Sequence, residues 1–279
     1  MSDPRETPAN GRVAHVSLVG VVDAEAFVAG EAAQIWGEPF LCRAPSGDRD
    51  RQLLHGDDFL VLERAAGWAF GQSQKDGYCG YVPQNALHAP MQATHRVWTR
   101  QSHLYEAPDL KQPAIDVLSM NARLRRLDGD EVWSKVETPN GAMFVPSMHL
   151  EVLSKRPSDL LTVAEAFLGT PYIWGGNGGQ GIDCSGLVQA ACLACGRACP
   201  GDSDQQEDRL GQDLGVGGPL ARNDLVFWPG HVAIATGDGR ILHATARYMA
   251  VVYEDFESAR ARIAAAGEGP VTRQRRLEV

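Results

Sequence analysis

The sequence lacks several features that would place it in a familiar class at once. No run of about 18 apolar residues occurs, so we expect no membrane-spanning helix. An excess of positive charge is also missing, and the formal net charge of −9 argues against binding to a phosphate backbone. Hydrophobic residues nevertheless make up 44% of the chain, which excludes general disorder. These features predict an acidic, soluble, mixed α/β protein whose partners are neither nucleic acid nor membrane.

Cysteines are too few and too clustered for a disulfide framework. They stand at positions 42, 79, 184, 192, 195 and 199. The segment 13–22 is interrupted by His15 and has no basic flank, so we expect a strand there, not a secretory signal, and a cytoplasmic location. Cys192, Cys195 and Cys199 have the spacing of one helix face. A zinc site needs four ligands and no second cluster is near, so we expect no metal and no cofactor.

The N-terminal half contains an internal β repeat. In both copies a strand leads through a glycine turn to a strand that contains Trp68 or Trp133, and an aromatic-Val-Pro step follows. This repeat resembles two bacterial SH3-like barrels, which bury their strand edges by closure. The resemblance implies one such domain at 13–90 and a second at 94–153.

The pattern changes at 155, where a third domain is expected to run to 279. Residues 158–172 have apolar residues at helical spacing behind Ser158 or Asp159 as N-cap, and 183–196 predict a second helix after a glycine-rich loop. Three strands, a helix and a last strand are expected at 224–228, 231–236, 240–245, near 255–266 and near 271–277.

One cysteine and two histidines form the sharpest constellation. Cys184 opens a helix behind Asp183, which can cap free N–H groups, and a helix N-terminus should lower the pKa of the thiol. His231 opens a strand, where a rigid imidazole can pair with a thiolate. A three-residue hairpin turn at 237–239 would put His243 on the same face as His231. We therefore predict a direct hydrogen bond between the two imidazoles.

A family resemblance is carried by two segments, TPYIWGGNGGQGIDCSGLV (170–188) and NDLVFWPGHVAIATGDGRILHA (223–244). Both resemble the NlpC/P60 cysteine peptidases. Members of that family fold as a papain-like α+β domain and cleave the γ-D-glutamyl bond to a diamino acid in cell-wall peptides. The resemblance therefore implies an α+β fold class, with a papain-like catalytic domain behind two small SH3-like barrels.

The resemblance also implies a role for individual residues. Cys184 would be the nucleophile, His231 the general base and acid, and His243 the residue that orients His231. Tyr172 matches the family tyrosine near the oxyanion site. A backbone N–H at the helix start by Cys184 would supply another donor, and Ser185 is expected with Tyr172 at the oxyanion or substrate site.

A further segment, ACPGDSDQQ (198–206), resembles the family's Pro-Arg-Asp-Ser-x-x-Gln stretch, with Gly201 in the place of the arginine. In the YkfC-type endopeptidases of murein peptide recycling, this Asp helps to bind the free amine of L-Ala. An acidic residue and a tyrosine of the first SH3-like domain complete that pocket. The implied amine-binding residues are Asp202, Ser203, Tyr78 and Asp50.

The expected function is a cysteine endopeptidase that acts on murein-derived peptides with a free N-terminal L-Ala. One alternative is a wall-binding protein or wall hydrolase whose SH3-like domains target peptidoglycan. Another is an amidase or acyltransferase on the same scaffold. The intact set of Cys184, His231 and His243 argues against a purely binding role.

Overall fold

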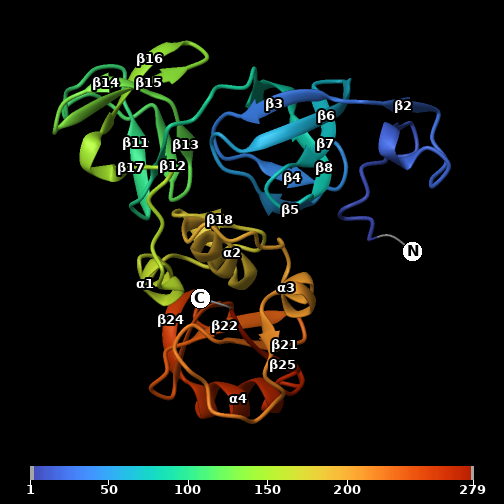
Figure 1. Cartoon of the computed structure of the whole chain (residues 1–279), viewed down its shortest axis with the longest axis vertical. Helices are drawn as coiled ribbons and strands as arrows, with labels where there is room; N and C mark the ends of the chain where they lie inside the picture. Colours follow the sequence, from blue (N-terminus) through green and yellow to red (C-terminus); the bar gives the residue numbers. More distant parts are fainter. Residues whose placement is uncertain (1–2, 278–279) are drawn as a thin grey trace. The chain divides into compact units, whose positions relative to one another are not determined.

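The computed structural model describes residues 3–277. The chain divides into two compact units, and the boundary along the chain lies between Lys155 and Arg156. Figure 1 labels the strands and helices of each unit. The first unit is built of strands and single turns of 3-10 helix, and the α-helices of the described residues lie in the second. No helix between residues 3 and 277 has the length and apolar character needed to cross a membrane.

The first part of unit one is a seven-stranded antiparallel sheet with the order β5-β4-β8-β7-β6-β3-β9. A short parallel pair precedes it, β1 (Val13–His15) with β2 (Ala26–Val28), joined through η1 (Val16–Leu18). The sheet consists of β3 (Glu31–Ile35), β4 (Phe40–Cys42), β5 (Arg49–Gln52), β6 (Asp58–Ala65), β7 (Trp68–Ser73), β8 (Cys79–Pro83) and β9 (Leu87–His88). Ala66 and Gly67 join β6 to β7 with positive φ at both positions, as the tight hairpin turn requires. Leu41, Phe59 and Val82 lie in its core.

The second part of unit one repeats this order of elements around a core of its own. Its strands are β10 (His95–Val97), β11 (Gln101–Leu104), β12 (Asp116–Ser119), β13 (Arg123–Leu124), β14 (Arg126–Gly129), β15 (Trp133–Thr138), β16 (Gly141–Pro146) and β17 (Leu150–Val152). In both parts the strand after the Trp strand ends at a proline, Pro83 or Pro146. A 3-10 turn follows it, η2 (Gln84–Ala86) or η3 (Ser147–His149). Val97, Leu118 and Val145 are buried in the second core.

A buried carboxyl group joins the two parts of unit one. Glu38 accepts hydrogen bonds from the backbone N–H of Ser119 and from its hydroxyl, the latter at 2.7 Å. Burial raises the pKa of Glu38 to about 7, although both hydrogen bonds act to lower it.

Unit two is a six-stranded antiparallel sheet with a helix on each face. Its order is β20-β25-β21-β22-β23-β24, and β18 pairs separately with β19. The strands are β18 (Asn177–Gly178), β19 (Gly181–Ile182), β20 (Gln212–Asp213), β21 (Leu225–Trp228), β22 (His231–Ala235), β23 (Arg240–Thr245), β24 (Ala250–Asp255) and β25 (Arg273–Arg276). The helices are α1 (Leu160–Glu165), α2 (Cys184–Ala194), α3 (Ser203–Arg209) and α4 (Phe256–Ala265). Helix α2 packs against β22 and β23, and Figure 1 shows α4 on the opposite side of the sheet.

Two expectations for unit two need correction, and some of its elements were not expected. The α-helix expected over 158–172 ends at Glu165; turns with i→i+3 hydrogen bonds follow it, and Gly169 with φ 79° ends them before Pro171. Strand β24 and helix α3 were not expected. Helix α2 ends at Ala194, so Cys199 does not share a helix face with Cys192.

Candidate functional site

The Asp183 carboxylate organises the start of α2. As N-cap it accepts the backbone N–H of Gly186 at 2.6 Å, and its other oxygen accepts the N–H of Gly175 at 2.8 Å. The Ser185 hydroxyl also donates to Asp183, at 3.2 Å. One side chain thus holds the glycine-rich loop against the first turn of the helix that begins with Cys184.

The glycines of this loop allow the chain to pack closely against itself. A Cβ at Gly186 would lie 2.3 Å from the carbonyl oxygen of Gly176, and a Cβ at Gly181 would lie 2.2 Å from the Ile173 side chain. Gly176 and Gly181 are both buried. The loop therefore needs glycine where it approaches the helix and the Ile173 side chain.

The thiol of Cys184 lies at the point where β22 begins. Its sulfur is 3.9 Å from the carbonyl oxygen of Gly230, and backbone N–H groups of Val232 and Ser185 face it. Gly230 and Val232 flank His231 along the chain. The fold thus brings the thiol to the start of the histidine strand.

The expectation of a lowered thiol pKa is wrong. Burial, and then the neighbouring Asp183 carboxylate, raises the pKa of Cys184 to about 12, against the backbone N–H groups that act to lower it. Burial, with smaller contributions from His243 and Arg262, lowers the pKa of His231 to about 3. Without substrate the thiol and the imidazole are therefore both neutral at pH 7.

The geometric prediction for the two histidines is confirmed. Ile234 pairs with Leu242 and Ala235 with Ile241, and the N–H of Thr236 donates to the carbonyl oxygen of residue 240, which closes a three-residue turn. His231 Nε2 lies 2.9 Å from His243 Nδ1. Because the turn has three residues, the register puts both rings on one face of the sheet.

The second histidine contacts a charged pair, Glu254 and Arg262, which was not predicted from the sequence. His243 is fully buried, and its Nε2 lies 3.2 Å from Glu254 Oε2 on β24. Arg262 of α4 donates to both oxygens of the same carboxylate, at 2.9 and 2.7 Å. Burial lowers the pKa of His243 to about 4, although Glu254 acts to raise it. Recognising β24 from its VVY run would have found this residue, since the register pairs Val252 with His243.

Tyr172 lies near the thiol on the chain segment that enters the glycine loop. Its backbone bridges to Ile182, and its N–H donates to the carbonyl oxygen of Met249 at 2.9 Å. Burial, and then the proximity of Cys184 and Asp183, raises the pKa of the Tyr172 hydroxyl, so it remains a protonated donor at neutral pH.

Buried amide side chains connect the Asp202 segment to the start of α2. Gln206 Nε2 donates to the carbonyl oxygens of Ser185 and Pro200, at 2.9 and 3.0 Å. Asp202 stands at the N-cap position of α3, and Ser203 begins that helix. Both side chains are partly exposed. The segment that was expected to bind the amine is thus fixed to the helix that carries Cys184.

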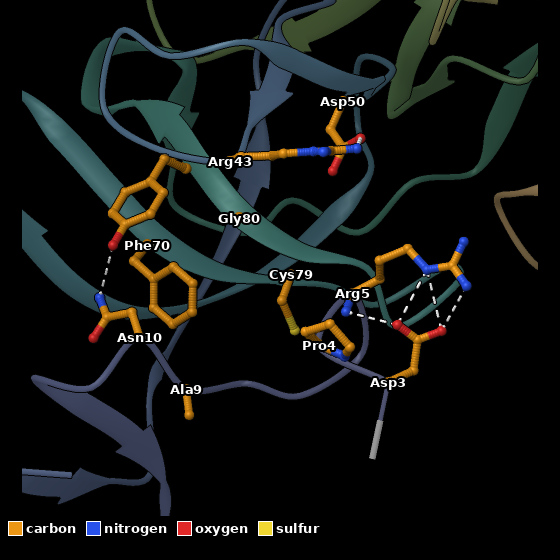
Figure 2. A pocket seen from close by; sticks show the side chains of 11 residues that line it. Asp3, Pro4, Arg5, Ala9, Asn10, Arg43, Asp50, Phe70, Cys79 and Gly80 are labelled. Carbon is orange, nitrogen blue, oxygen red and sulfur yellow. Dashed lines mark hydrogen bonds and ion pairs between the residues drawn. The ribbon is translucent and has the colours of Figure 1, made fainter. Parts of the chain in front are cut away.

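Asp50 and Tyr78 have different surroundings in unit one. Asp50 lines a cavity of about 890 Å³ on the outside of the first barrel, where Arg43 pairs with it at 3.0 Å (Figure 2). Tyr78 is 1% exposed and packs in the barrel core. Side chains alternate along β5, so Arg51 points inward where its neighbour Asp50 points outward. Their expected part in the amine pocket stays a prediction.

The described residues, 3–277, contain no group of three or more His, Cys, Asp or Glu side chains arranged to hold a metal ion. All six cysteines are free thiols. Cys199 contacts the Gln206 amide and the carbonyl oxygen of Pro200, which gives it a packing role.

An antiparallel sheet covered by helices, with a cysteine at a helix N-terminus and hydrogen-bonded histidines on adjacent strands, is typical of papain-like cysteine peptidases. Two segments of the chain match known families. Residues 169–263 match the NlpC/P60 family, and residues 41–87 match the bacterial dipeptidyl-peptidase SH3 domain. The chain carries an NlpC/P60 cysteine peptidase domain preceded by a bacterial SH3 domain.

Curated relatives extend this match over both units. A γ-D-glutamyl-L-lysine dipeptidyl-peptidase of Bacillus cereus is 28% identical over 226 residues, which cover 70% of this chain and 67% of the relative. Its counterpart from Bacillus subtilis is 28% identical over 218 residues, covering 69% and 71%. The crystal structure of an NlpC/P60 family protein from Bacillus cereus superposes with a TM-score of 0.74 at 22% identity, covering 88% of this chain and 99% of that one. That structure supports the fold.

Proposed function

We propose that the protein is a γ-D-glutamyl-L-diamino acid endopeptidase that acts on short murein-derived peptides with a free N-terminal L-Ala. Two observations carry the proposal: the Cys184 sulfur lies 3.9 Å from the carbonyl oxygen of Gly230, the residue before His231, and His231 is hydrogen-bonded to His243. The relatives named γ-D-glutamyl-L-lysine dipeptidyl-peptidases support the choice of scissile bond. Murein peptide recycling is the process that would supply such peptides.

In the proposed reaction His231 accepts the proton of the Cys184 thiol as the sulfur attacks the γ-carbonyl carbon of D-Glu. The oxyanion that forms is stabilised by the Tyr172 hydroxyl and by a backbone N–H at the start of α2. His231 then donates its proton to the departing amine of the diamino acid. Water, deprotonated by His231, hydrolyses the thioester and restores the thiol.

The neutral resting pair suits this sequence of steps. With the pKa of Cys184 raised and that of His231 lowered, the proton moves only when substrate is present. Positive charge on His231 then develops beside His243, which orients the ring through the contact at 2.9 Å.

Asp202 is proposed to select the free amine. The Gln206 hydrogen bonds hold its segment against the start of α2, and a carboxylate there can form a charge-assisted hydrogen bond with an ammonium group. Ser203 would contribute a neutral hydroxyl beside it. A peptide whose L-Ala amine is acylated, as in intact wall, would lose that interaction.

The test is hydrolysis of L-Ala-γ-D-Glu-L-Lys, its N-acetylated form and intact sacculi, with products identified by mass spectrometry. We expect L-Ala-D-Glu and free lysine from the first, and an about 10–100-fold lower kcat/KM for the acetylated peptide, the worth of one charge-assisted hydrogen bond. The D202N variant should lose most of this preference. D208N, which changes an exposed carboxylate on the same helix, should keep it. Equal rates on both peptides would contradict the amine site, and products from sacculi alone would favour a wall hydrolase.

We also propose that residues 94–153 form a second SH3-like domain, on the basis of the repeated order of elements around a separate core. A reducing compartment, the cytoplasm, is proposed from the six free thiols, which include Cys184. Cell fractionation with an antibody to the protein tests the location. Recovery with the cell wall would contradict it.

A further inference from the structure

Three polar side chains form a diagonal line across β22, β23 and β24. The register that pairs Ala235 with Ile241 places His243 opposite residue 233, two positions from His231. His243 also pairs with Val252, two positions from Glu254. Residues two apart on a strand share a face, so all three side chains stand on the same face of the sheet.

Glu254 is anionic and can only accept hydrogen bonds. Although burial acts to raise its pKa, the Arg262 guanidinium and then His243 hold the pKa of Glu254 below its ordinary value. Arg262 binds both oxygens of the carboxylate, and the Glu254 side chain is only 9% exposed. An ionised carboxylate has no proton to donate. The ring nitrogen that faces it must therefore carry the proton.

This requirement determines the protonation of both rings. His243 Nε2 lies 3.2 Å from Glu254 and carries a proton, so Nδ1 of the neutral ring is an acceptor. His231 Nε2 lies 2.9 Å from that acceptor and must donate to it. The free nitrogen of His231 is then Nδ1, which has the lone pair that a general base needs.

We propose that Glu254, held by Arg262, is a positioning residue that fixes the tautomers of His243 and His231 and so presents Nδ1 of His231 to Cys184. The inference rests on the proposed function for the identity of the base, but the tautomers can be measured without turnover. In the substrate-free protein His243 Nε2 lies 3.2 Å from Glu254 Oε2, but the pair does not have the geometry of a hydrogen bond. Catalytic hydrogen bonds often tighten only when substrate binds.

The E254Q variant tests this with little change of volume. Arg262 donates only, so it selects the amide oxygen of the introduced glutamine side chain and turns the NH₂ group of that side chain toward His243. His243 Nε2 then becomes an acceptor, its Nδ1 carries the proton, and His231 must switch to the tautomer that lacks a free Nδ1. E257Q is the matched control, because Glu257 is an exposed α4 residue paired with Arg260.

The measurements are nitrogen NMR of the full-length protein with nitrogen-15 labelled histidine, and kcat and KM on L-Ala-γ-D-Glu-L-Lys. In the wild type and in E257Q we expect protonated Nε2 and unprotonated Nδ1 for both rings. E254Q should reverse both tautomers and lower kcat about 10–100-fold, the range found when the partner that orients a metal-ligating histidine is removed, with little change in KM. A wild-type spectrum with protonated Nδ1 on His243 would overturn the inference. Unchanged tautomers in a folded E254Q protein would do the same. Absence of peptide turnover in the wild type would instead refute the proposed function, while the spectra still decide the role of Glu254.

Discussion

Replacing Gly186 by alanine should separate the catalytic helix from the loop that supports it. The added Cβ would lie 2.3 Å from the Gly176 carbonyl oxygen, whereas real Cβ contacts essentially never fall below 3.0 Å. The two backbones must therefore part by about 0.7 Å. Neither partner is a flexible side chain that can rotate away. The same carbonyl oxygen accepts the N–H of Asp183 at 3.1 Å, so the shift also strains the N-cap.

The opposing energies can be compared. Alanine favours a helix over glycine by about 1 kcal/mol. Overpacking costs about 1–3 kcal/mol, and weakening the Asp183 hydrogen bond costs about 0.5–1.5 kcal/mol. The clash should win, with a net loss of about 0.5–3.5 kcal/mol and a decrease of about 2–14 °C in the Tm of unit two. Displacing Cys184 by a fraction of an ångström should lower kcat by up to about 100-fold.

The assay is thermal unfolding together with peptide hydrolysis, and G218A is the control. Gly218 is exposed, does not need positive φ, and has nothing within 4 Å of an added Cβ. Alanine there should leave Tm and kcat unchanged. A G186A protein with the Tm and kcat of the wild type would show that the helix and the loop are not closely packed at the site.

Three further predictions concern protonation and charge. Y172F should lower kcat about 10–1000-fold with a smaller effect on KM, because the hydroxyl is a preformed oxyanion donor; an unchanged kcat removes it from that role. Alkylation of Cys184 by iodoacetamide, measured by peptide mapping, should accelerate about tenfold per pH unit from pH 6 to 9, since the thiol pKa lies near 12. A flat profile over that range would indicate a preformed ion pair with His231. The raised pKa of Glu38 means that its contribution to stability is complete below about pH 4.5 and is lost as the pH rises through about 7. The urea midpoint of the wild type should therefore fall more than that of E38Q between pH 5 and 8, and parallel curves would contradict the shift.

The features predicted best from the sequence depend on local chemistry and on the number of residues in a hairpin turn. The cap at Asp183 follows from its place before a helical pattern, and the histidine pair follows from a three-residue turn that fixes the register. The β repeat was visible because glycine turns and Pro83 or Pro146 mark the same points in both copies.

What the sequence did not reveal depends on packing between distant segments. The thiol pKa reflects burial of Cys184 under β22, which local spacing does not report. Glu254 was not identified because the many charged residues near the C-terminus gave no clear strand pattern for β24. The burial of Tyr78 in the core of the first sheet also depends on packing, and its expected role in the amine pocket stays a prediction.

The central claim is that Cys184 attacks the γ-glutamyl carbonyl, and the covalent intermediate tests it most directly. L-Ala-γ-D-Glu-L-Lys is mixed with the protein, the reaction is stopped in acid within one turnover, and the adduct is mapped by mass spectrometry. The account predicts an L-Ala-D-Glu acyl group, heavier than the thiol by the dipeptide less one water, on the peptide that contains Cys184, and no adduct or turnover in C184A. Product formation by C184A, or an acyl group on any other residue, would contradict it.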